Sequence, residues 1–100
     1  MSLFETREEL LKAVDEAEAR LRKKYKLATF NTLVDACHAR ILLAERRTGD
    51  CPMHLAFAVA QEAKDMHMQE AFDLALMVVK RLEKNPESSK KGMNIKEVST

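Results

Sequence analysis

Cys51 and His54 lie three residues apart in the segment GDCPMHLAF, and both side chains can bind a metal ion. A structural zinc site takes four ligands, so a second such pair would be needed. The other soft ligands come as two adjacent pairs, Cys37–His38 and His67–Met68. Neighbours on a helix point about 100° apart, so neither pair supplies the missing ligands unless a turn at residues 67–68 brings His67 and Met68 together. We therefore expect no metal site and no cofactor.

Cys51 is also a candidate for thiol chemistry. A thiolate in the first turn of a helix is favoured by the positive end of the helix dipole, and His54 is close enough in sequence to assist. The same segment is explained without chemistry as a helix start, with Asp50 as the N-cap and Pro52 in the first turn. We prefer the helix start, and keep thiol- or metal-dependent activity at Cys51 and His54 as a third hypothesis.

Enzymatic function has little support in the sequence. His38 follows Asp35 by three residues and Glu70 follows His67 by three, so each pair could share a helix face, but neither has a nucleophile beside it. The chain has two glycines, too few for a GxGxxG or Walker loop. We expect that the protein is not an enzyme and has no catalytic residues.

A basic run, RLRKKYK at residues 20–26, is the strongest signal for nucleic acid. The formal net charge of the chain is only +1, and cations at the end of a helix also suit its dipole. A small nucleic-acid-binding regulator is therefore the alternative function. Its candidate residues are Arg20, Arg22, Lys23, Lys24 and Lys26.

These residues must be positioned by helices. Two glycines and two prolines are too few for the many turns of an all-β protein. Apolar residues recur at helical spacing, which predicts three or four helices packed as antiparallel hairpins. The predicted ranges are 3–25, about 29–47, 53–65 and 68–84, with one long helix over 53–84 as an alternative. We expect a single helical domain, residues 1–85, and a flexible, disordered C-terminal tail, residues 86–100.

The segment AFDLALMVV, residues 71–79, is apolar at eight of nine positions. A helix that covers one core needs an apolar stripe only about 100° wide or somewhat more. This segment has more apolar surface than one core needs, which predicts a homo-oligomer, most simply a dimer, or a partner protein. The alternative is a monomer in which this helix lies centrally. The predicted interface residues are Phe57, Phe72, Leu74, Leu76, Met77 and Val79.

The function that this pattern favours is a small non-enzymatic protein–protein interaction module, such as an adaptor, a chaperone-like protein or a regulator. The N-terminus becomes charged by residue 5 and has no apolar signal region, and no apolar run approaches the about 18 residues of a membrane helix. Free cysteines suit a reducing compartment. We expect a cytoplasmic protein with no membrane contact.

Overall fold

The computed structural model describes residues 3–84, which form an all-α fold of four helices. These are α1 (Arg7–Lys24), α2 (Leu27–Thr48), α3 (Pro52–Asp65) and α4 (Gln69–Lys84). The predicted fold class and the predicted turn between the last two helices are confirmed, so residues 53–84 are two helices. His67 makes this turn with a positive φ of 57°. The predicted tail, residues 86–100, lies outside the described residues.

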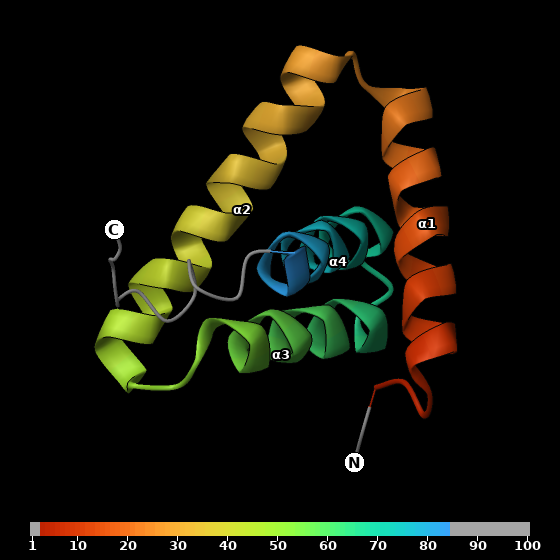
Figure 1. The fold of residues 1–100 in the computed structure, drawn as a ribbon. Coiled ribbons are helices and arrows are strands. Elements are labelled where there is room, and N and C mark those ends of the chain that lie inside the picture. Colours follow the sequence, from red (N-terminus) through yellow and green to blue (C-terminus); the bar gives the residue numbers. More distant parts are fainter. Residues whose placement is uncertain (1–2, 85–100) are drawn as a thin grey trace, which may run out of the picture.

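Helices α1 and α2 meet at their connection and diverge from it like the two sides of a wedge, and α3 and α4 lie between their open ends (Figure 1). Helix α4 packs against all three other helices, and α3 is its antiparallel partner. Seven of the 16 residues of α4 are buried. They are Asp73, Ala75, Leu76, Met77, Val78, Val79 and Leu82. The core of the molecule is therefore built around α4.

This arrangement corrects the sequence argument for three predicted interface residues. Leu76 is 0% exposed, Met77 4% and Val79 0% within a single chain. Helices α1, α2 and α3 cover the apolar surface of α4, so these side chains need no partner to leave water. The central placement of the fourth helix, given above as the alternative, is what the structure has.

The helix ends follow local rules. The Thr6 hydroxyl accepts a hydrogen bond from the backbone N–H of Glu9 at 3.0 Å, and the Glu9 carboxylate accepts one from the N–H of Glu5 at 3.0 Å. Helix α2 ends at Gly49, whose φ of 82° is the left-handed conformation expected of a C-terminal cap. It begins at Leu27, two residues before the predicted start at about residue 29, and its N-cap Lys26 makes no side-chain capping bond.

Candidate functional site

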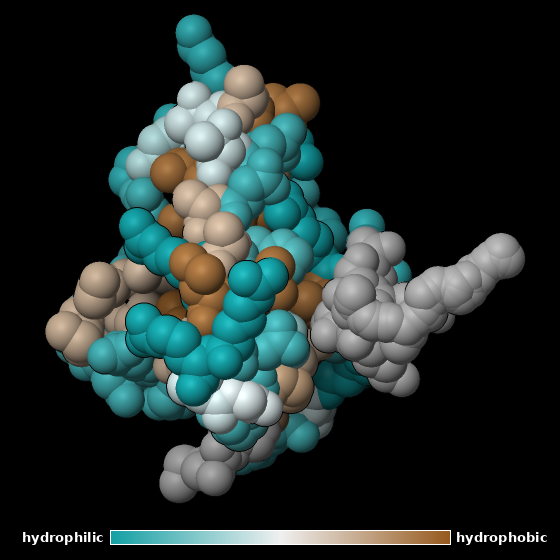
Figure 2. Space-filling view, turned by 90° about the vertical axis from the view of Figure 1, so that its left-hand side faces the viewer, coloured by the Kyte–Doolittle hydropathy of each residue, from teal (hydrophilic) through white to brown (hydrophobic). Residues whose placement is uncertain are grey.

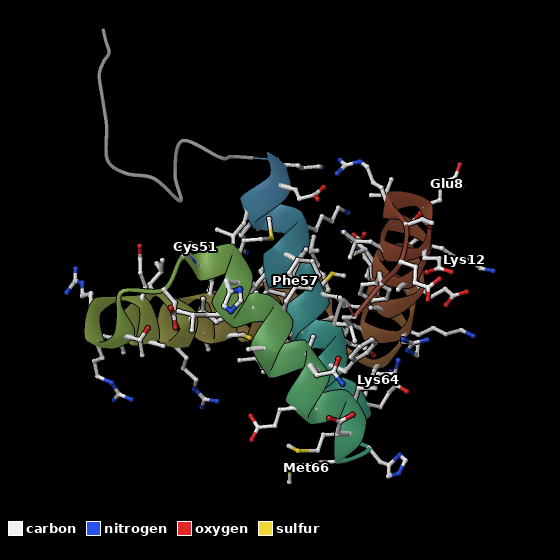
Figure 3. The ribbon with its side chains drawn as sticks, turned by 90° about the horizontal axis from the view of Figure 1, so that it is seen from below. Glu8, Lys12, Cys51, Phe57, Lys64 and Met66 are labelled. Atoms are coloured by element: carbon white, nitrogen blue, oxygen red, sulfur yellow. The ribbon has the colours of Figure 1, made fainter. Side chains whose placement is uncertain are left out.

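An open apolar groove of about 450 Å³ lies where α2, α3 and the start of α4 meet. Helices α2 and α3 diverge from the connection that contains Cys51 (Figure 3), and the residues of the groove come from the sides of the two helices that face each other. The lining residues are Leu33, Ala36, Cys37, Arg40, Ile41, Ala44, Leu55, Ala58, Val59, Glu62, Ala71 and Leu74. All of them except Arg40 and Glu62 are apolar.

Helical spacing explains why these residues form one surface. The lining positions on α2 run from Leu33 to Ala44 in steps of one, three and four residues, and those on α3 run from Leu55 to Glu62 in the same way. Each helix thus has two apolar stripes side by side, one against α4 and one in the groove. Figure 2 shows the side of the molecule where α2 and the start of α3 lie, and hydrophobic side chains gather in its middle between hydrophilic ones.

The two charged residues of the groove stand on opposite walls, with Arg40 on α2 and Glu62 on α3. Both are exposed. Neither side chain has an ion-pair or hydrogen-bond partner among residues 3–84. The groove therefore offers one free cation and one free carboxylate beside an apolar surface.

Helix α2 is the least covered helix of the four. It is the longest, with 22 residues, yet only Phe30, Val34 and Ile41 of these are buried. Leu27 is 57% exposed, Leu42 37% and Leu43 59%. The surplus apolar surface that the sequence argument placed on α4 thus lies on α2 in the structure. The location of this exposed apolar surface depends on which helix the others surround, so the spacing of apolar residues along the chain does not show it.

The other three predicted interface residues are half-buried and do not form one patch. Leu74 lines the groove, whereas Phe57 faces the N-terminal segment, where its ring contacts that of Phe4 with centroids 6.5 Å apart. Phe72 lies beside the α3–α4 turn, near Lys64 and His67. Of the six residues, Leu74 alone belongs to the groove.

The candidate thiol site at Cys51 is a helix start. Cys51 itself is the N-cap of α3, and its sulfur accepts a hydrogen bond from the backbone N–H of His54 at 3.4 Å. Pro52 occupies the first turn, as predicted, but Asp50 lies one residue too early to cap the helix. Both cysteines of the chain are free thiols. In the described part of the chain, no three His, Cys, Asp or Glu residues come together as a metal site.

The basic run at the end of α1 is largely engaged in ion pairs with the rest of the fold. Arg20 pairs with Asp73, Arg22 with Glu18, and Lys24 with Glu70. The Tyr25 hydroxyl also donates to Glu70, at 2.9 Å, which with Lys24 lowers the pKa of Glu70. Lys23 and Lys26 are the predicted nucleic-acid residues that lack such partners within residues 3–84.

The predicted pair of Asp35 and His38 is joined by a third residue. Arg81 of α4 lies 2.7 Å from the Asp35 carboxylate and 3.5 Å from Nδ1 of His38. Burial and the Arg81 charge lower the pKa of His38. His67, by contrast, lies in the α3–α4 turn, and Glu70 points to Lys24 and Tyr25 rather than to it. Asp35 and His38 thus tie α2 to α4 through Arg81, and Glu70 ties α4 to the end of α1. Neither group of residues includes a nucleophile.

Comparisons with known proteins give no relative for this chain. No family model matches it, and neither a curated protein nor a solved structure matches it. None of the helices in residues 3–84 combines the length and the apolar character needed to cross a membrane.

Proposed function

We propose that this chain is a small non-enzymatic protein–protein interaction module that binds its partner in the groove between α2 and α3. The observation that supports this is an open groove of about 450 Å³ that is lined mainly by apolar residues of three helices. An exposed apolar surface rimmed by charged residues is typical of a binding site. Adaptor, chaperone-like and regulatory roles all consist of such binding.

The shape of the groove favours a helix as the bound element. Its α2 wall extends from Leu33 to Ala44, a rise of about 17 Å or three helical turns. Alanines at positions 36, 44, 58 and 71 leave room for a neighbouring backbone to approach. An amphipathic helix that lays its apolar face in a hydrophobic groove is a common mode of recognition.

The nucleic-acid alternative is less well supported by the structure. Phosphate binding needs cations that are free to neutralise phosphates and so displace the counterions condensed on the nucleic acid. Three of the five predicted cations are already paired within the fold. The third hypothesis, thiol or metal chemistry at Cys51 and His54, has one point in its favour, an exposed thiol at the N-cap of α3. Within residues 3–84, however, no further His, Cys, Asp or Glu joins this pair as a metal site.

The test is photo-cross-linking from inside the groove. A benzophenone amino acid replaces Ala36 or Ala58 in the full chain, and Leu11 on α1, an exposed position outside the groove, serves as the control. We expect both groove positions to give the same adduct, with a cross-linked peptide that mass spectrometry identifies as an amphipathic segment. Groove positions that give no more adduct than position 11 would overturn the proposal.

A further inference from the structure

We infer that the occupant of the groove is a second copy of this chain, so that the α2 helices of two copies pack side by side across a two-fold axis. This inference rests on the proposed function of the groove as a protein-binding site. Three observations support it. Helix α2 is incompletely covered, its exposed residues Ala36 and Leu43 lie beside the groove, and the groove walls carry opposite charges.

First, α2 is covered less by the rest of the chain than the other three helices are. Only three of its 22 residues are buried, whereas α4 buries seven of 16. Leu43, three residues after Arg40, is 59% exposed and lies at the outer edge of the groove stripe. Ala36, one turn before Arg40, is exposed as well. Ala36 and Leu43 form an exposed ridge of α2 on either side of Arg40, and this ridge adjoins the groove.

The second argument is geometric. The contact surfaces of a two-fold dimer are the same patch on both copies, so the patch must be complementary to itself. Here the ridge of α2 lies directly beside the groove that α2 shares with α3. A two-fold rotation can therefore bring the ridge of each copy into the groove of the other. A projecting helix on a different side of the molecule would instead give a head-to-tail contact, which forms rings or open chains.

The third argument is charge. Arg40 on α2 and Glu62 on α3 have opposite signs, stand on opposite walls and lack partners within residues 3–84. When α2 of one copy enters the groove of the other, its Arg40 approaches the wall that carries the other copy's Glu62. The two-fold axis repeats the pair, so two free cations meet two free carboxylates. A partner of uniform charge would satisfy only one of the two residues.

The experiment measures the mass of the purified full chain by light scattering over a dilution series. We expect a dimer of two 11.4 kDa chains. Arg40→Glu alone and Glu62→Arg alone should each raise the dimer dissociation constant at least about tenfold, because each places like charges opposite one another twice. Mixing the two variants should restore a dimer, since every contact then joins a glutamate to an arginine. Lys12→Glu, a charge reversal far from the groove (Figure 3), is the matched control and should have no effect.

The two cysteines give a second readout on the unmodified chain. Cys37 lines the groove, and Cys51 is exposed outside it. We expect alkylation of Cys37 by iodoacetamide to slow several-fold as the protein is concentrated, while alkylation of Cys51 keeps its rate. This comparison needs no substitution, so it does not depend on the folding of any variant.

Four outcomes would overturn the inference. The first is a monomer throughout the dilution series. The second is a dimer that is indifferent to both charge reversals and leaves Cys37 unprotected, because the interface would then lie elsewhere. The third is groove cross-linking to a protein other than a second copy, which would keep the proposed function and remove the dimer. Absence of any adduct from the groove would remove both.

Discussion

The guanidinium of Arg20 on α1 donates two hydrogen bonds to the carboxylate of Asp73 on α4, at 2.8 and 3.1 Å. Asp73 is 2% exposed, and the side-chain amide of Gln69 donates a third hydrogen bond to it at 2.9 Å. A carboxylate taken out of water must be matched by donors, so this pair fixes how α1 lies on the central helix. It also explains why a cation of the basic run is not free for phosphate.

Removal of the Arg20 side chain should destabilise the fold. Arg20→Ala leaves the buried Asp73 carboxylate with Gln69 as its remaining side-chain donor, which should lower the free energy of unfolding by about 1–3 kcal/mol. Urea unfolding followed by circular dichroism measures the change. Lys23→Ala, at an exposed neighbour without an ion pair in the described part, should change it by less than about 0.5 kcal/mol. Equal effects of the two substitutions would contradict the role given to the pair.

Leu76 should behave as a core residue rather than as an interface residue. It is fully buried at 0% exposure, so Leu76→Ala should lower the free energy of unfolding by about 2–5 kcal/mol. Leu76→Glu should unfold the chain rather than produce a folded monomer. Circular dichroism and light scattering on the same sample separate these results. Leu11→Ala, at a 44% exposed leucine of α1, is the control and should cost far less.

The helices and their turns could be predicted from the sequence because they depend on nearby residues. The apolar spacing in 71–79, the glycine at position 49 and the proline at position 52 act over one or two turns, and the structure has the expected elements there. The sequence favours Asp50 as the cap of α3 because aspartate is a better hydrogen-bond acceptor than a thiol. The chain instead enters the helix one residue later, at Cys51.

The groove could not be predicted, because it depends on tertiary packing. The apolar surplus in residues 71–79 indicates that α4 needs more cover than one neighbour gives, but not whether that cover comes from the same chain. In the structure α1, α2 and α3 all supply it, and α2 is left with a second apolar stripe from Leu33 to Ala44. The lining of α3 includes Leu55 and Val59, whose spacing of four residues predicts that they share one side of the helix but does not show what faces that side.

Acid should weaken the fold through two glutamates. The hydrogen bond from Lys80 lowers the pKa of Glu18, and those from Lys24 and Tyr25 lower the pKa of Glu70. Because the folded pKa lies below the unfolded value of 4.5, the folded state prefers the charged form. The resulting stability is complete above about pH 5 and is lost as pH falls through the folded pKa.

The measurement is urea unfolding between pH 7 and pH 3. The double variant Glu18→Gln and Glu70→Gln should be less stable than the unmodified chain at pH 7, and its stability should change less as pH falls. A matched control is Glu8→Gln at an exposed glutamate near the start of α1, which makes no ion pair within residues 3–84 and should leave the pH profile unchanged. A double variant with the same pH profile as the unmodified chain would contradict the two ion-pair assignments.

The chain should show no binding to nucleic acid that depends on the basic end of α1. Lys23 and Lys26 are the two cations of this end without partners in the described residues, and two phosphate contacts give little affinity at physiological salt. Fluorescence anisotropy with a labelled 20-nucleotide RNA and a 20-base-pair DNA at low salt measures this. Affinity that falls steeply with salt and is lost in Lys23→Glu together with Lys26→Glu would revive the nucleic-acid alternative.

The start of α3 offers a test in which the two neighbouring residues should respond differently. Cys51 holds the N-cap position, with its sulfur 3.4 Å from the N–H of His54, and a thiol is a weak acceptor. Cys51→Ser or Cys51→Asp should therefore raise the free energy of unfolding by about 0.5–1 kcal/mol, because an oxygen caps better than sulfur. Asp50→Ala should leave it within about 0.5 kcal/mol, since the Asp50 side chain caps nothing. Urea unfolding of the three variants beside the unmodified chain decides the matter. A loss of stability in Asp50→Ala with no gain in Cys51→Ser would return the cap to Asp50.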